Sequence, residues 1–330
     1  MHIEEYSILF GKIIGLRVGE KNLKGGFVLK VRLGLLLFTL ILALIPVYLI
    51  LTNAFNYSPI NPDERCQLPP DEKETYIIFL SGIDSSCDGT VFNQMGFEYL
   101  RRKLSQVGLS YKDEHFLMYS YTGGEVREGR WFPNTYIPVD TGQPIALSVM
   151  RLREMIGEFN RYHPRARFLL IGHSLGGRIA FDYAIKYHLE RPGHIKGVIT
   201  LNAPLIGTPY IKADIFAFVK PILSTPAVRQ LMDEYQLRNE SGILKQKVNA
   251  ARRLTAEGIY LATFGTRQDI IVHPFSACIT DEQGNPLTKG NIVSVNIFTS
   301  DFKKLSGHRQ ILTHKEVVKS IISIYTNPVL

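Results

Sequence analysis

The hexapeptide at residues 172–177, of sequence GHSLGG, constrains the fold of this chain more than any other feature. It lies between an apolar run at 168–171, typical of a buried strand, and a segment whose apolar side chains recur at helical spacing. A sharp turn from strand to helix brings the main chain so close that positions two before and two after its centre tolerate little besides glycine. Gly172 and Gly176 occupy these positions around Ser174. The pattern is therefore typical of a nucleophile elbow, whose helix directs free N–H groups towards the serine.

The residues that such a serine needs as partners follow further along the chain. A base must take the hydroxyl proton and a carboxylate must orient that base, in the chain order serine, acid, histidine. Residues 259–264 predict a strand, and Asp269 follows it after a short turn. Residues 291–299 predict the next strand, and His308 follows after a loop. The sequence therefore predicts Asp269 as the acid and His308 as the base.

Three other residues compete for these two roles. His314 is an alternative base, although its place near the start of the terminal helix also fits a solvated capping residue. His273 lies four residues after Asp269 and is interpreted as a neighbour of the acid loop. Asp301 is a reserve candidate for the acid, disfavoured because it follows the last predicted strand.

The oxyanion donors are predicted at two main-chain positions. The N–H of Leu175 follows the serine directly, and the second donor is expected in the loop after the strand at 75–80. In that loop Gly82 permits close approach of the main chain, and the N–H of Ile83 is the expected donor.

An apolar run at 33–51 predicts a membrane span near the N-terminus. It contains nineteen residues without a charge, which as a helix approaches the ~30 Å thickness of the hydrocarbon layer. Residues 1–32 carry six Lys or Arg against three Glu, whereas residues 52–75 carry two against five Asp or Glu. By the positive-inside rule we expect 1–32 as a basic cytosolic tail, 33–52 as a single transmembrane helix and an extracytoplasmic remainder.

A cleaved signal peptide is the main alternative to this anchor. The residues at 52–54, Thr-Asn-Ala, resemble a small-residue cleavage site, but the charged region before the apolar run is unusually long for a signal peptide. A buried core helix is disfavoured because the run has no polar face.

Residues 53–74 predict an extended linker, because they combine four prolines with polar side chains. Residues 75–330 then suffice for one large α/β domain with a substantial core. This domain carries a net charge of +8, scattered along the sequence, which fits a solvated surface or contact with anionic lipid headgroups. No motif supports nucleic-acid binding. The three cysteines are too few for a zinc site or a disulfide framework. A single disulfide, with Cys66–Cys87 as the pair to test, and small buried thiols fit them equally well.

With these residues in place, the chain resembles the α/β-hydrolase superfamily, in its serine lipase and esterase branch. The GHSLGG elbow and the segment at 198–209 are similar to those of bacterial triacylglycerol lipases and of GPI inositol-deacylase-like proteins. The resemblance implies a mostly parallel central sheet flanked by helices, with a helical cap at about 210–258. Carried over residue by residue, it implies Ser174 as nucleophile, with Asp269 and His308 as its partners and the N–H groups of Leu175 and Ile83 as oxyanion donors. The first loop departs from the usual His-Gly by having Ser81 before Gly82.

The sequence therefore predicts a membrane-anchored serine hydrolase that cleaves carboxylic esters, with lipid esters favoured, through an acyl-enzyme on Ser174. An apolar cap would bind acyl chains, although the same apolar stripe also fits simple packing on the core. No metal or organic cofactor is required by this chemistry. An acyltransferase with the same triad and a noncatalytic, membrane-tethered binding module remain the alternatives. The sequence does not specify the acyl chain, the headgroup or the oligomeric state.

Overall fold

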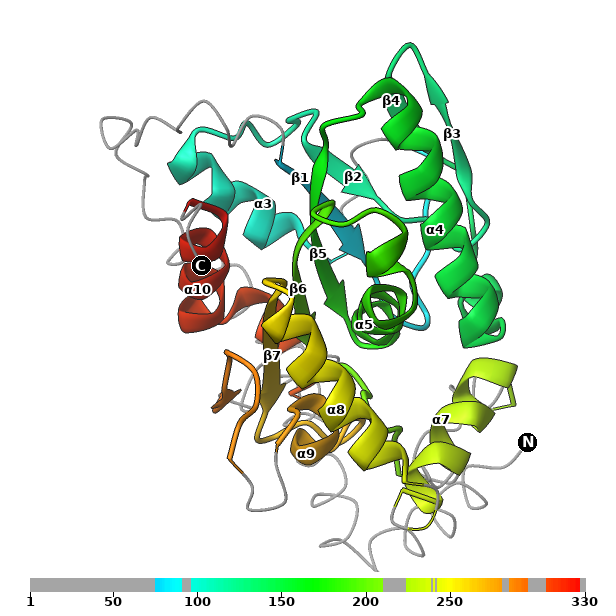
Figure 1. Ribbon diagram of the computed structural model, residues 1–330, viewed down its shortest axis with the longest axis vertical. Coiled ribbons are helices and arrows are strands. Elements are labelled where there is room, and N and C mark those ends of the chain that lie inside the picture. The colour runs from blue at the N-terminus through cyan, green and yellow to red at the C-terminus, as the bar shows by residue number, and fades with distance from the viewer. Residues whose placement is uncertain are drawn as a thin grey trace, which may run out of the picture. The chain divides into compact units, whose positions relative to one another are not determined.

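Within the described residues, six parallel strands form the central sheet of this protein (Figure 1). The computed structural model describes residues 75–90, 96–209, 224–238, 240, 242–280, 285–295 and 307–326. The strands of the sheet are β1 (Thr75–Leu80), β2 (Phe116–Met118), β5 (Arg167–His173), β6 (Ile195–Leu201), β7 (Tyr260–Thr266) and β8 (Ile292–Val293). Their order across the sheet is β2-β1-β5-β6-β7-β8, so β5 lies near its middle.

The remaining elements connect or cover these strands. A separate antiparallel pair is formed by β3 (Gly124–Arg127) and β4 (Arg130–Pro133). The helices are α3 (Glu98–Leu104), α4 (Ile145–Tyr162), α5 (Leu175–Tyr187), α7 (Pro226–Gln236), α8 (Ile243–Ala256), α9 (Pro274–Ala277) and α10 (Lys315–Thr326). Short 3-10 turns are η2 (Ser105–Val107), η3 (Pro138–Gly142), η4 (His188–Glu190) and η7 (Gln310–Thr313).

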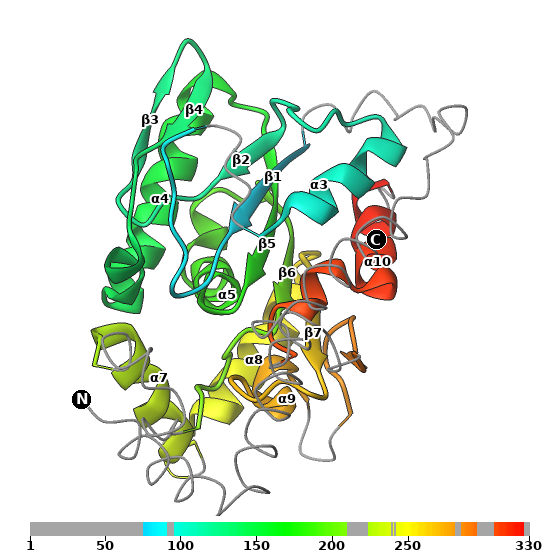
Figure 2. The same cartoon turned by 180° about the vertical axis from the view of Figure 1, so that it is seen from behind.

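The strands are apolar on both faces because helices cover both sides of the sheet. Successive side chains of a strand point to opposite faces. In β5, Phe168 and Leu170 join one core cluster, whereas Leu169 and Ile171 join the other. The first cluster includes buried residues of α4, α5 and α8, and the second includes those of α3 and α10. Figures 1 and 2 show α4 and α5 on one side of the sheet and α3 and α10 on the other.

This architecture confirms the predicted α/β class with a parallel sheet flanked by helices. The strand predicted at 291–299 is shorter in the structure. In the described part of this run, β8 contains only Ile292 and Val293. Beyond it the main chain leaves the sheet, and the N–H of Val295 donates to Gln268 Oε1 at 3.0 Å instead. Residues 296–299 lie outside the described residues.

The predicted cap at 210–258 includes residues 210–223, which lie outside the described residues, together with α7 and α8. Ala251 and Leu254 of α8 are buried in the core with α5 and β7, so this helix is part of the crossover from β6 to β7. The cap itself stays a prediction.

The predicted tail, span and linker at 1–74 lie outside the described residues, as does Cys66. Within the described ranges, no helix is long and apolar enough to cross a membrane.

Candidate active site

Ser174 lies at the sharp turn between the central strand and its helix. β5 ends at His173 and α5 begins at Leu175, so a single residue makes the turn. Its φ of 54° and ψ of −127° are rare for a residue with a side chain and cost about 1–3 kcal/mol. The N–H of Ser174 donates to the Leu201 carbonyl at 2.9 Å, which ties the turn to the end of β6. The side chain is partly exposed at the carboxyl edge of the sheet.

The glycines of the motif are required by close main-chain approach. A Cβ at Gly172 would collide with the main chain of Gly176, and a Cβ at Gly176 would collide with the carbonyl of Leu80 in β1. The two positions predicted from the sequence to require glycine are therefore positions where a larger residue would displace main chain.

Asp269 and His308, 39 residues apart in sequence, lie side by side in the structure. His308 Nδ1 lies 2.7 Å from Asp269 Oδ2, and because a carboxylate only accepts, we assign the proton to Nδ1. The other carboxylate oxygen accepts the N–H groups of Ile271 and Val272 at 2.8 and 3.0 Å. The Asp269 side chain is fully buried, so its carboxylate accepts hydrogen bonds from three donors of the protein instead of from solvent. In the neutral ring this tautomer makes Nε2 the acceptor nitrogen of His308.

His308 is linked to the elbow by a hydrogen bond from His173, the residue before Ser174. His173 Nε2 donates to the His308 carbonyl at 3.0 Å, and the two imidazole rings have centroids 4.8 Å apart. Burial first, and then the nearby charge of His308, hold the pKa of His173 well below its ordinary value, so this ring is a neutral donor. Among the described residues no hydrogen bond joins the Ser174 hydroxyl to His308. Such bonds often tighten only when substrate binds.

The competing residues lie elsewhere. His273 is exposed and caps the short helix α9, where its Nδ1 accepts the Phe275 N–H at 3.4 Å. His314 stands just before α10, and no hydrogen bond to Asp269 is present in the part of the chain that the structure describes. Asp301 lies outside the described residues.

The loop after β1 packs directly against the serine. A Cβ built on Gly82 would lie 2.5 Å from Ser174 Cβ and 3.0 Å from its Oγ, so only glycine fits there. Ile83 follows Gly82 in this loop, and Leu175 is the first residue of α5, where N–H groups lack intrahelical partners. Both predicted oxyanion donors therefore belong to segments that adjoin Ser174, and their role stays a prediction.

Side chains from other elements hold this loop in place. The Tyr121 hydroxyl donates to the Ser81 carbonyl at 2.8 Å, and the Ser85 hydroxyl donates to the Gly82 carbonyl at 2.6 Å. The N–H of Asp84, which has a φ of 63°, donates to Thr141 Oγ1 at 3.1 Å. Burial raises the pKa of Tyr121, which keeps its hydroxyl protonated as a donor.

A cluster of four charges, unpredicted from the sequence, joins the elbow helix to α7 and α8; the Arg178 side chain is buried and the other three are partly buried. Arg178 of α5 binds Glu234 of α7 through two bonds of 2.5 and 2.9 Å and binds Asp182 at 2.6 Å. Asp182 in turn contacts Lys247 of α8. Burial raises the pKa of Asp182, but the charges of Arg178 and Lys247 outweigh it and leave that pKa below its ordinary value. The sequence pattern that could have indicated this cluster is the pair Arg178 and Asp182, spaced i,i+4 in an otherwise apolar helix.

Asn202 was likewise missed as a functional candidate. It directly follows β6, is fully buried and lies between the acid loop and His308. The sequence did offer one indication: Asn202 is a polar residue at the carboxyl end of a predicted parallel strand, and ligands of α/β sheets bind at the edge formed by these ends.

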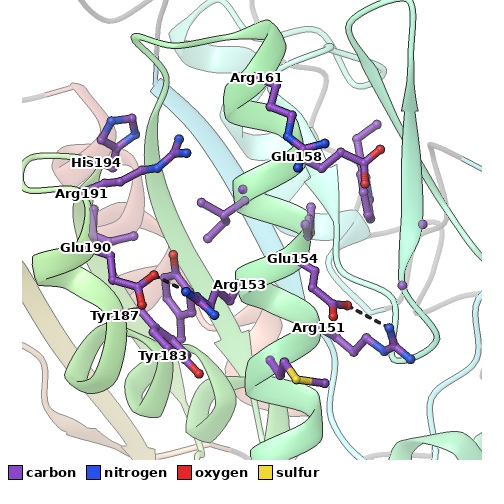
Figure 3. Close-up of a pocket in the computed structure, with 18 of the residues that line it drawn as sticks. Arg151, Arg153, Glu154, Glu158, Arg161, Tyr183, Tyr187, Glu190, Arg191 and His194 are labelled. Carbon is purple, nitrogen blue, oxygen red and sulfur yellow. Dashed lines mark hydrogen bonds and ion pairs between the residues drawn. The ribbon is translucent and has the colours of Figure 1, made fainter.

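A surface groove of about 720 Å³ runs along α4 (Figure 3). Its lining includes Arg151, Arg153, Glu154 and Glu190 but none of the predicted triad residues. Figure 3 shows these side chains pairing with one another across the helix surface. The predicted triad therefore lies outside this groove. Within the described residues no group of three or more His, Cys, Asp or Glu side chains is placed to hold a metal ion.

Comparison with solved structures finds distant similarity to several hydrolases. Phospholipase PlaB from Legionella pneumophila, in complex with thio-NAD, is similar at 13% identity and a TM-score of 0.45, over 76% of this chain and 61% of that protein. Naproxen esterase from Bacillus subtilis is similar at 11% identity and a TM-score of 0.43, over 78% and 85%. The monoacylglycerol lipase of Paleococcus ferrophilus is similar at 14% identity and a TM-score of 0.39, over 78% and 96%. The chain thus spans less than two thirds of the length of the Legionella protein.

Among curated proteins, no sequence matches the chain. Residues 72–238 match the sequence model of the alpha/beta hydrolase fold family. This segment contains β1, the elbow at Ser174, β6 and α7. The chain belongs to the alpha/beta hydrolase fold family.

Proposed function

We propose that this protein is a serine ester hydrolase that works through an acyl-enzyme on Ser174. The observation that carries the proposal is the Asp269–His308 pair, which is bound at 2.7 Å and held next to the elbow by His173. A buried carboxylate on Nδ1 fixes the tautomer in which Nε2 accepts the serine proton.

The reaction follows from these positions. Ser174 Oγ attacks the ester carbonyl carbon while His308 Nε2 takes its proton, and the carbonyl electron pair moves onto oxygen. The N–H groups of Leu175 and Ile83 stabilise that oxyanion, and removal of one such donor typically costs about 2.7–4 kcal/mol. As the intermediate collapses, the C–O bond of the leaving alcohol breaks and His308 gives the alcohol its proton. Water then repeats the sequence on the acyl-enzyme and releases the acid.

Lipid esters are the substrate class that we favour. Apolar side chains stand exposed on segments that adjoin the site. Ile137 and Val139 lie at η3, whose Thr141 bonds the loop after β1. Ile270 directly follows Asp269, and Phe275 lies on α9. Such side chains on the rim of a polar site would contact an acyl chain.

Hydrolysis of p-nitrophenyl esters with acyl chains of rising length tests the activity and the class together. We expect turnover that rises with chain length in the wild type and disappears in Ser174→Ala. Preference for short chains would contradict the lipid class but not the ester hydrolase. Acyl products that appear only when an alcohol or amine is added would identify an acyltransferase, and no turnover on any ester would favour a binding module.

Membrane anchoring through residues 33–52 is a separate part of the proposal, supported by the uncharged run and its flanking charges. Protease added outside intact cells should remove the domain from Asn53 onward and spare the N-terminal tail. Complete protection of the domain would contradict this orientation.

A further inference from the structure

We propose that Asn202 is a positioning residue that holds the acid and the base of the triad in register with each other. The inference rests on the proposed function, because it assigns a role within the same site. Asn202 directly follows β6, its side chain is completely buried, and its φ of 47° lies in the left-handed region. Asn tolerates that region better than most residues with a side chain.

The amide of Asn202 uses both of its ends. Its Nδ2 donates to the His308 carbonyl at 2.9 Å and to Thr266 Oγ1 at 3.0 Å. Its Oδ1 accepts the N–H of Thr266 at 2.7 Å. One side chain therefore binds the end of β7 and the main chain of the base at the same time.

These bonds close a ring that contains the acid and the base. The Thr266 carbonyl accepts the N–H of Asp269 at 3.1 Å, and the Asp269 carboxylate binds His308 Nδ1 at 2.7 Å. Asn202 completes the circuit from Thr266 back to the His308 carbonyl. The base is thus held from its ring by the acid and from its main chain by Asn202, which together fix where Nε2 points.

A second donor on the same carbonyl extends the ring to the nucleophile. His173 Nε2 also donates to the His308 carbonyl and is adjacent to Ser174 in sequence. Within the part of the chain that the structure describes, His173 forms no hydrogen bond to the acid loop, so Asn202 is the residue of this pair that links the acid loop to the base.

The contacts explain why the residue is an amide. Alanine would remove all of these side-chain bonds, including a longer one of 3.5 Å from Nδ2 to the Gly307 carbonyl, and would leave the Thr266 N–H without its acceptor. Aspartate keeps the shape and the acceptor, but it places an oxygen lone pair against the His308 carbonyl where Nδ2 now donates. Asn202→Asp therefore removes the link to the base with little change in volume.

The test compares wild type, Asn202→Ala and Asn202→Asp as full-length chains. For both variants we expect kcat on a p-nitrophenyl ester to fall about 10–100-fold, with KM within about twofold, because small misplacement of a catalytic group costs roughly that much. The pH profile of kcat/KM should shift, and the downfield proton resonance of His308 Nδ1–H should weaken or move. Thr266→Val, which removes only the Oγ1 acceptor, should give a smaller loss in the same direction.

Asn160→Ala is the matched control. Asn160 is a buried Asn on α4, and neither end of its amide has a hydrogen-bond partner among the described residues. It should leave the pH profile and the resonance unchanged, which separates positioning from general loss of a buried amide. If Asn202→Ala does not fold, Asn202→Asp and Thr266→Val decide the question.

Unchanged kcat, pH profile and resonance in folded Asn202 variants would overturn the proposal. The resonance needs no turnover, so the positioning role and the proposed function fail separately. A wild type that hydrolyses no ester would contradict the function while the shift of the Nδ1–H signal still reports on Asn202.

Discussion

The triad region and the groove along α4 both carry charged side chains, but they hold them in opposite ways. In the groove, Arg153 binds Glu190 and Arg151 binds Glu154 with all four side chains well exposed to solvent. At the carboxyl edge of the sheet, Asp269 is fully buried and accepts three donors. Exposed ion pairs of the first kind contribute about 0–1 kcal/mol, whereas fixed dipoles in a dry site can stabilise charge that develops during a reaction. The comparison favours the carboxyl edge of the sheet as the candidate site, because its polar groups are preorganised, although the groove is the more open space.

Removal of the base should give the largest effect. We expect His308→Ala to lower kcat for ester hydrolysis roughly 10⁶-fold, because the serine then has no proton acceptor. His314→Ala is the control and should stay within about twofold. Comparable losses in the two variants would show that the base was misassigned.

A change in the loop after β1, which contains Gly82 and Ile83, should give the next largest loss of activity. Gly82→Ala places a methyl group against Ser174, so the loop must move away and carry the Ile83 N–H with it. We expect kcat to fall about 10²–10³-fold, as for the loss of one oxyanion donor. Gly157→Ala on α4, where a Cβ would meet nothing within 4 Å, should leave kcat unchanged. Wild-type kcat in folded Gly82→Ala would contradict the placement of this loop.

Buried and exposed ion pairs can be compared directly in stability. Arg178→Met leaves Asp182 and Glu234 without their main partner, and we expect the free energy of unfolding to fall by about 3–5 kcal/mol in denaturant titrations. Arg153→Met in the groove should give no measurable change. Because the folded-state pKa of Asp182 lies below its ordinary value, its share of stability is present above about pH 3.9 and is lost as the pH falls through the lowered pKa. Equal effects of both substitutions would remove the contrast.

A smaller effect is expected in the acid dependence of stability. The folded-state pKa of His173 lies well below its ordinary value because of burial and the nearby His308. Below about pH 6.5 the unfolded chain binds a proton at this residue and the folded protein does not, so stability falls as the pH falls. Thermal midpoints measured between pH 7 and pH 5 should therefore decline less in His173→Gln than in wild type. A parallel decline would show that His173 is not the group responsible.

Much of the fold and the order of the candidate site could be predicted because they depend on local pattern. The apolar run before Ser174, its flanking glycines and the strands before Asp269 and His308 each act within a few residues of sequence. Asn202 and the Arg178–Glu234 bridge could not be predicted, since their partners lie 106 and 56 residues away and meet only in the folded chain. The short length of β8 could not be predicted either. After this strand the Val295 N–H donates to the side chain of Gln268, which belongs to another loop, and the alternation of apolar residues gives no information on such a contact.

The central claim is that Ser174 is a nucleophile activated by His308 and Asp269. Mass-spectrometric mapping of the adduct formed by a fluorophosphonate with the folded protein tests it most directly, because the reagent labels activated serines. The account predicts one adduct, on Ser174, formed much more slowly in His308→Ala and in Asp269→Asn. No adduct, an adduct on another serine, or equal labelling of the three proteins would contradict it.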